Sequence, residues 1–188
     1  PLYSSAASDV YKRQNLLFCC EELPELVLGC EICEDLWVAD PPSTSHALAG
    51  ATVIANLSAS NETVSKDAYR ELLVKSTSAR LLCGYIYTSA GEGESTQDLV
   101  FGGHNLIAEN GTLLAQSSRF ATGILYTDMD VLKISNERRR MGTFGKQPTV
   151  SYCKIPFSME LTETRLERKF AAHPFVPEDP ALRNRRCE

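Results

Sequence analysis

The sequence predicts an α/β fold, in which strands and helices alternate along the chain. From Leu16 onward, short apolar runs alternate with stretches whose apolar residues recur at a helical period. The chain has 188 residues, of which 43% are hydrophobic and 23% are charged, so it can hold one domain with a sizeable core or be a piece of something larger. This composition is that of a globular protein and argues against collagen, a coiled coil or disorder.

The first predicted strand runs from Leu26 to Cys33. We expect it to be buried on both faces, because most of its residues are apolar. Two prolines at positions 41 and 42 then prevent regular pairing. Ser43 is expected to cap a short helix that continues to Ala49 and that Gly50 closes.

A second strand and a helix follow. The strand is predicted from Ala51 to Leu57, where β-branched residues are frequent, and the polar loop 58–63 comes after it. Between Lys66 and Leu82, apolar residues recur at spacings of roughly 3.6, which predicts an amphipathic helix with one buried stripe. The predicted stripe consists of Ala68, Leu72, Leu73, Ala79 and Leu82.

The remaining strands are predicted to include a hairpin. A third strand is expected from Cys83 to Thr88. The apolar runs 106–108 and 112–114 flank Asn110-Gly111, a strong hairpin turn signal, so the sheet would change here to antiparallel pairing. One more strand is predicted from Gly123 to Asp130.

Charge argues against a nucleic-acid partner. The formal net charge is -5, whereas a protein that binds the phosphate backbone usually carries clustered Lys and Arg. The one basic cluster, residues 138–140, is short. It can be a solvated surface or a positive rim for an anionic partner.

The cysteines and the hydropathy pattern indicate a cytoplasmic protein. Seven cysteines, an odd number with irregular spacing, fit reduced thiols better than a disulfide framework. No run approaches the roughly 18 apolar residues that a membrane span needs, and the N-terminus shows no secretory pattern. We therefore expect no membrane partner.

Cys30 and Cys33 form a C-x-x-C pair, a spacing that also occurs in redox centres and zinc sites. In a strand, residues three apart point to opposite faces with Cα atoms roughly 10 Å apart, beyond the roughly 7 Å limit for a disulfide. The histidines, His46, His104 and His173, are scattered singly and complete no zinc tetrahedron. We therefore expect neither a redox pair nor a metal.

Cys33 is a candidate nucleophile because it lies at the carboxyl end of its predicted strand, where catalytic groups of α/β sheets gather. The backbone N–H groups that follow it are free to stabilise an oxyanion. The alternative is a buried, inert thiol, because free cysteines are among the most buried residues. Residue types alone leave both interpretations open.

A resemblance to a known family favours the nucleophile. Residues 29–37, Gly-Cys-Glu-Ile-Cys-Glu-Asp-Leu-Trp, followed by Pro-Pro-Ser at 41–43, resemble the nucleophile motif of the nitrilase (carbon-nitrogen hydrolase) superfamily, in its variant from glutamine-dependent NAD synthetases. The resemblance runs from about Leu17 to the C-terminus. Further stretches similar to that variant occur in the expected order at 49–60, 91–100, 109–111 and 119–120.

The resemblance implies a partial αββα sandwich and an amidase that hydrolyses L-glutamine to glutamate and ammonia. A synthetase domain in the same chain would use this ammonia, with ATP and Mg²⁺, to amidate nicotinic acid adenine dinucleotide. Cys33 would be the nucleophile, and the backbone N–H of Glu34 would help to hold the oxyanion. No cofactor is implied for the residues of this chain, and a homo-oligomer is expected.

Two further residues are implied to bind the substrate. By motif position, Ser60 would contact the α-amino or α-carboxylate group of glutamine, and a plain loop-capping serine is the alternative. Lys66 lies where related proteins often carry a basic residue, commonly Arg, that pairs with the substrate carboxylate. A Lys offers a point charge in place of a bidentate fork, which weakens that role, and a solvated charge at the helix start is its alternative.

The family pattern also sets the expected organisation. Its catalytic Glu and Lys precede the nucleophile by long intervals, and neither maps to residues 1–32, so we expect this chain alone to be inactive. Residues 1–14 are expected to be a non-native leader, 15–150 the C-terminal part of the glutaminase domain, and 151–188 a linker with the start of the synthetase domain. A stand-alone nitrilase-type amidase and a degenerate interaction module of the same fold are the alternatives.

Overall fold

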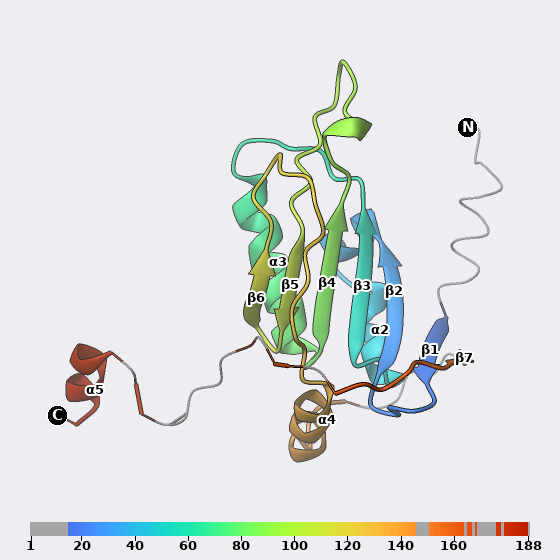
Figure 1. The fold of residues 1–188 in the computed structure, drawn as a ribbon, viewed down its shortest axis with the longest axis vertical. Helices are drawn as coiled ribbons and strands as arrows, with labels where there is room; N and C mark the ends of the chain where they lie inside the picture. Colours follow the sequence, from blue (N-terminus) through green and yellow to red (C-terminus); the bar gives the residue numbers. More distant parts are fainter. Residues whose placement is uncertain are drawn as a thin grey trace.

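The computed structural model describes residues 15–145, 151–163, 165–166, 168, 176–177 and 179–187. Its centre is a seven-stranded mixed sheet with the strand order β6-β5-β4-β3-β2-β1-β7 (Figure 1). The predicted α/β class is confirmed, whereas the predicted leader 1–14 and His173 lie outside the described residues. The strands are β1 (Leu16–Cys20), β2 (Val27–Ile32), β3 (Val53–Ser58), β4 (Gly84–Ser89), β5 (Leu106–Glu109), β6 (Thr112–Gln116) and β7 (Cys153–Phe157).

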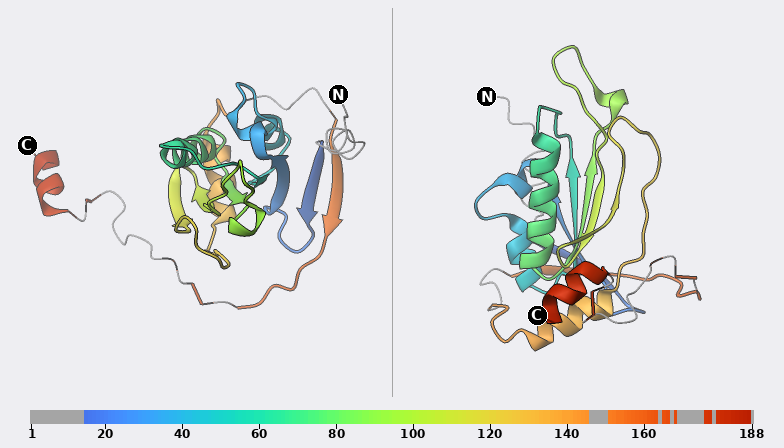
Figure 2. Two further views of the ribbon diagram at one scale, coloured as in Figure 1. Left: turned by 90° about the horizontal axis from the view of Figure 1, so that it is seen from above. Right: turned by 90° about the vertical axis from the view of Figure 1, so that its left-hand side faces the viewer.

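Two of the helices cover one face of this sheet. In Figure 2, α2 and α3 lie together on that face, and α4 lies near one end of the strands. No helix among the described residues combines the length and the apolar character that crossing a membrane requires. The α-helices are α2 (Pro42–Leu48), α3 (Lys66–Arg80), α4 (Val131–Arg140) and α5 (Pro180–Cys187), and the 3-10 helices are η1 (Cys33–Trp37) and η2 (Glu92–Glu94).

The middle of the sheet is parallel. β2 pairs with β3, and β3 pairs with β4, all three running in the same direction. The connections between them contain α2 and α3. Because the carboxyl ends of parallel strands meet at one edge, the segments that follow β2 and β3 emerge there together.

The predicted hairpin is confirmed on the β4 side of the sheet. β5 is antiparallel to β4 and to β6, and Glu109 pairs with Thr112 across the turn. Asn110 has a φ of 46° and Gly111 a φ of 83°, so both turn residues are left-handed, as the Asn-Gly signal requires. On the other side, β1 pairs antiparallel with β2 and parallel with β7.

β2 is buried on one face only, which corrects the prediction of burial on both faces. Gly29 and Glu31 point toward the helices, and a Cβ on Gly29 would lie only 3.0 Å from the Cβ of His46 in α2. Ile32 points the other way and is 43% exposed. The reason is that the helices that pack on β2 lie on only one side of it (Figure 2).

The predicted buried stripe of α3 is wrong in part, because polar residues face the sheet. Leu72 is 61% exposed, whereas Arg70 is fully buried. Arg70 is accommodated by an ion pair with Glu62 at 2.7 Å, and the Ser78 hydroxyl donates to the carbonyl of Cys83 at 2.7 Å. The ion pair offsets part of the cost of burying Arg70, whose Nε and Nη2 have no hydrogen-bond partner among the described residues, and the carbonyl satisfies the Ser78 hydroxyl. The residues of α3 that are buried are Arg70, Val74, Thr77 and Ser78.

The predicted strand from Gly123 to Asp130 is also wrong. The segment forms no ladder, and its Ile124 is 91% exposed. It passes over β4 and β5 (Figure 2), both of which already have a neighbouring strand on each side. An extended segment therefore has no free strand edge there to pair with.

Candidate active site

The backbone turns sharply at Cys33, where β2 ends and η1 begins. The φ of Cys33 is 49°, in the left-handed region that residues other than glycine rarely adopt. The Asp35 carboxylate closes this turn by accepting the backbone N–H of Ile32 at 2.8 Å. Strained backbone of this kind concentrates at functional sites. We call this turn, residues 32–35, the elbow, and it places Cys33 at the carboxyl edge of the sheet, as the sequence predicts.

Glu34 follows the cysteine in the first turn of η1, and its side chain is exposed. The first backbone N–H groups of a helix have no partner within that helix. The N–H of Glu34 is therefore available to stabilise negative charge on a substrate oxygen beside Cys33. This geometry suits the role that the resemblance implies for it.

Ser60 lies at the same edge of the sheet, two residues beyond the end of β3. It is 5% exposed. The loop is fixed beside it, because the backbone N–H of Glu62 donates to the carbonyl of Val100 at 2.7 Å. Ser60 thus lies in an ordered position in the loop that follows the strand next to β2.

Lys66 is held near the end of η1. Its Nζ donates to Oδ1 of Asn61 at 2.7 Å and lies 5.5 Å from the centroid of the Trp37 ring. Trp37, the last residue of η1, also packs against Tyr69 of α3 at a centroid distance of 5.4 Å. The structure therefore brings Lys66 to the short helix that begins at Cys33.

Two other thiols, Cys30 and Cys83, are poorly suited to nucleophilic chemistry. Burial raises the pKa of the Cys30 thiol, and burial raises that of Cys83 to about 12, although the charges of Arg138 and Arg80 lower it. Because the thiolate is the nucleophile, a raised pKa lowers reactivity. Cys30 and Cys33 are both free thiols, one within β2 and the other at the elbow.

A buried carboxylate lies directly before the elbow. Glu31 is 1% exposed, and its Oε2 accepts the backbone N–H of Ser43 at 2.9 Å. Its Oε1 accepts the hydroxyl of Tyr85 and the Nδ2 of Asn56, the latter at 3.5 Å. Ser43 is therefore not the predicted cap, since α2 begins one residue earlier with Pro41 as its N-cap.

Sequence reasoning missed Glu31, Asn56 and Tyr85 as parts of the site. A single Glu between Cys30 and Ile32 carries no signal of burial. The signal that could have indicated its burial was the spacing of two residues from Gly29, because residues two apart in a strand share a face and Gly29 is buried. Burial and the negative charge of Glu31 raise the pKa of Tyr85 well above its ordinary value of 10.0, so the hydroxyl remains a donor.

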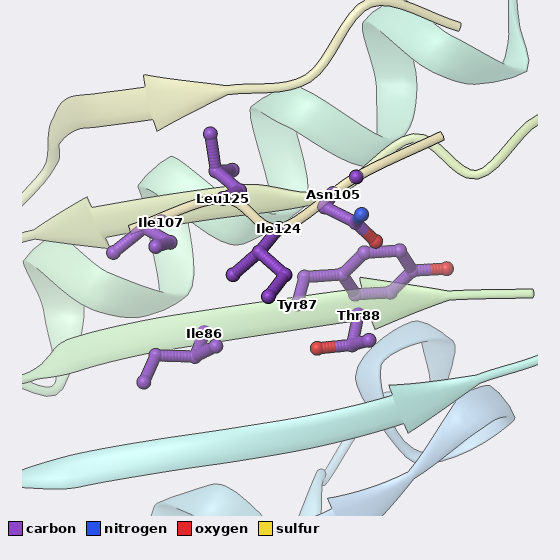
Figure 3. A pocket seen from close by; sticks show the side chains of 8 residues that line it. Ile86, Tyr87, Thr88, Asn105, Ile107, Ile124 and Leu125 are labelled. Atoms are coloured by element: carbon purple, nitrogen blue, oxygen red, sulfur yellow. The ribbon is translucent and has the colours of Figure 1, made fainter. Parts of the chain in front are cut away.

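A cavity of about 270 Å³ lies away from these residues, between β4, β5 and the segment 123–125 (Figure 3). Ile86, Ile107 and Leu125 contribute apolar walls. None of the four predicted site residues lines it. Within the described part of the chain, no group of three or more His, Cys, Asp or Glu side chains is arranged to hold a metal ion.

Comparison with known proteins is consistent with this geometry. Residues 4–139 match the carbon-nitrogen hydrolase family. The chain is 44% identical over 190 residues to the glutamine-dependent NAD(+) synthetase of Mycobacterium tuberculosis, which covers 96% of this chain and 28% of that protein. Identity to the synthetase of the same name from Mycobacterium leprae is also 44%, over 92% of this chain and 27% of the relative. The chain thus spans less than a third of the length of these relatives.

Solved structures agree on the fold. The carbon-nitrogen hydrolase of Helicobacter pylori superposes with a TM-score of 0.52 at 22% identity, over 61% of this chain and 43% of that one. The glutamine-dependent NAD+ synthetase of Acinetobacter baumannii gives a TM-score of 0.53 at 23% identity, over 65% of this chain and 23% of that one. These structural neighbours share the α/β fold, and the match over residues 4–139 shows that the chain belongs to the carbon-nitrogen hydrolase family.

Proposed function

We propose that this chain is part of the glutaminase domain of a glutamine-dependent NAD synthetase. The elbow carries the proposal, because a thiol held in strained backbone at the carboxyl edge of a sheet suits attack on an amide. The names of the relatives at 44% identity support glutamine as the substrate. A synthetase domain of the same cytoplasmic protein would consume the ammonia, using ATP and Mg²⁺ that no residue of this chain is assigned to hold.

The proposed reaction begins with attack of the Cys33 sulfur on the side-chain amide carbon of glutamine, which forms a tetrahedral oxyanion. The backbone N–H of Glu34 donates to this oxyanion. The C–N bond then breaks, and ammonia leaves with the proton that a general base took from the thiol. Water cleaves the glutamyl thioester through a second oxyanion, which releases glutamate and restores the thiol. The base is the Glu that the family resemblance implies, and no residue of this chain is assigned to it.

Ser60 and Lys66 are proposed to bind the α-groups of glutamine. Lys66 supplies a positive charge whose position is fixed by Asn61 and by the face of Trp37. The Ser60 hydroxyl can donate and accept a hydrogen bond, which suits either the α-amino or the α-carboxylate group. Both residues follow β3, next to the strand that ends at Cys33.

Replacing the proposed nucleophile tests this function. In the intact protein, Cys33→Ala is expected to abolish NAD synthesis with glutamine while synthesis with free ammonia continues, because only the first route needs the thioester. Both rates are measured by following NAD formation. Cys30→Ala is the matched control: it removes a thiol of the same motif that lies within β2, and it should leave both rates within about twofold. Persistent glutamine-dependent synthesis in Cys33→Ala would refute the proposal.

A further inference from the structure

We infer that Glu31 is a positioning residue for Cys33, because its buried carboxylate holds the elbow in the strained conformation that presents the thiol. The kinetic consequence of this inference rests on the proposed function. The structural part rests on hydrogen bonds among described residues. Glu31 is not proposed to contact the thiol or the substrate. It acts through the backbone of the cysteine.

Glu31 connects three elements around the elbow. Ser43 belongs to α2, Asn56 to β3 and Tyr85 to β4, and each directs a donor at the carboxylate. Glu31 and Tyr85 are almost fully buried, so no solvent competes for these bonds. One side chain therefore fixes β2, the strand before the cysteine, relative to the start of α2, to the adjacent strand β3 and to β4 beyond it.

The network needs acceptors at both oxygens of residue 31. All three partners are donors, and a carboxylate is the side chain that only accepts. A glutamine in its place would present an NH₂ group either to the N–H of Ser43 or to the side of Tyr85 and Asn56. One buried donor would then lose its acceptor, which is the expensive outcome for buried polar groups.

Asn56 links this network to the cysteine. Its Nδ2 lies 3.5 Å from Oε1 of Glu31 and 3.5 Å from the carbonyl oxygen of Cys33. Both of these oxygens accept, so they select the NH₂ end of the amide, and the Ser58 hydroxyl donates to its Oδ1 at 2.6 Å. A φ of 49° at Cys33 persists only where surrounding contacts enforce it, and this amide provides one such contact.

The test compares two buried glutamates in the intact protein. Glu31→Gln is expected to lower kcat for glutamine by about 10-fold to 100-fold with KM within about twofold, because the thiol is misplaced while the proposed binding residues are unchanged. NAD synthesis from free ammonia should not change. Glu109→Gln is the control, since Glu109 is also 1% exposed but lies beside the start of β4, at the opposite ends of the strands from Cys33. It should leave kcat for glutamine within about twofold.

A second readout does not depend on the reaction. Hydrogen exchange of the backbone amides of residues 33–37 should be at least about tenfold faster in Glu31→Gln than in the wild type, and unchanged in Glu109→Gln. Tyr85→Phe keeps the carboxylate and removes one donor, so it should give a smaller change in the same direction. It also serves if Glu31→Gln fails to fold.

The outcomes separate this inference from the proposed function. Unchanged kcat and unchanged exchange in Glu31→Gln would overturn the positioning role, even where Cys33→Ala is inactive with glutamine. Faster exchange at the elbow, combined with full glutamine-dependent activity in Cys33→Ala, would overturn the proposed function and leave the structural role standing. A drop in kcat of equal size in Glu109→Gln would also overturn the inference, because it would show a general effect of lost stability.

Discussion

Two glutamates, Glu31 and Glu109, are equally buried, each 1% exposed, but the molecule stabilises their charges in different ways. Glu31 is surrounded by neutral donors. Glu109 pairs with two cations, Arg168 at 2.7 Å and Lys133 at 3.6 Å, and accepts the backbone N–H of Asp130 at 2.7 Å. The pairing of β5 with β4 places Glu109 opposite Gly84, the first residue of β4, so it lies at the opposite ends of the strands from Cys33.

The two glutamates have different partners because they do different structural tasks. Burial tends to raise the pKa of Glu109, but hydrogen bonds from Arg168 and Asp130 and the nearby positive charges lower it overall. This cation-paired carboxylate fastens α4 and residue 168 to the end of β5. Glu31, by contrast, fixes local geometry with directional hydrogen bonds from rigid elements. The donors to Glu31 come from a helix and two strands of the sheet, so the preferred angles of these hydrogen bonds fix the position of β2 beside the elbow.

Breaking the ion pair between Arg168 and Glu109 should have the largest effect on stability. Arg168→Leu removes the closest cation from a buried carboxylate, which should lower the free energy of unfolding by about 3 kcal/mol at pH 7. The pKa of Glu109 is lowered in the folded state, so its stabilising contribution is present above the ordinary value of 4.5 and is lost as pH falls through the folded value. The difference between variant and wild type should therefore shrink in acid.

Urea unfolding at pH 7 and near pH 4 measures this difference. Arg139→Leu is the control, because Arg139 is exposed and its side chain contacts Asn136 within the same helix. It should change the free energy of unfolding by less than about 0.5 kcal/mol. An Arg168→Leu deficit that is equally large in acid would show that lost packing, and not the ion pair, explains it.

Removing one of the neutral donors to Glu31 should have a smaller effect on stability. Tyr85→Phe removes a hydrogen bond to a charged group and should lower the free energy of unfolding by about 2 kcal/mol. Tyr87→Phe provides a sharp control, because Tyr87 is also 0% exposed but its hydroxyl has no hydrogen-bond partner among the described residues. That variant should be neutral or slightly stabilising. Equal losses in both variants by urea unfolding would contradict the role of the Glu31 network.

The smallest expected effect concerns His46, which contacts β2 from α2. Its Nε2 lies 3.0 Å from the Cys30 carbonyl, so it donates there, and its Nδ1 accepts from the Tyr152 hydroxyl at 2.9 Å. Burial lowers the pKa of His46 below its ordinary value of 6.5. Its contribution to stability is therefore complete above pH 6.5 and is lost as pH falls through the folded value.

Comparison with His46→Gln isolates this contribution. Burial also lowers the pKa of His104, but His104 is present in both proteins, so its effect cancels. Below pH 6.5 the wild type should lose up to about 1.4 kcal/mol more per pH unit than the variant. Parallel stability curves between pH 7 and pH 5 would show that His46 is protonated equally in both states.

The parts of the fold that sequence predicted were those encoded by local chemistry. Asn110 and Gly111 supply the left-handed turn that their residue types favour, and the apolar run before Cys33 ends where acidic residues begin. The segment from Gly123 failed because strand formation depends on a free partner edge, which no local pattern reports. The buried stripe of α3 failed because Arg70 is buried with an ion-pair partner, Glu62, in the loop before the helix and a further partner, His104, 34 residues away.

For the candidate site, the sequence predicted where the residues lie, whereas their roles stay predictions. Cys33, Ser60 and Lys66 follow strands that meet at one edge, which the order of apolar runs already indicated. Glu31 could not be predicted as a network centre, because its donors come from three elements and one of them, Tyr85, lies 54 residues away. Side-chain networks between distant elements are products of the fold, so the sequence shows their members but not their contacts.

Trapping the acyl intermediate shows directly whether Cys33 is the nucleophile. The intact protein is mixed with glutamine, quenched in acid within one turnover and digested, and the peptide that contains residues 29–37 is analysed by mass spectrometry. We predict a mass increase of one glutamyl group on Cys33, which is absent in Cys33→Ala and unchanged in position in Cys30→Ala. A glutamyl group on another residue, or glutamine hydrolysis that continues without an adduct in Cys33→Ala, would contradict the account.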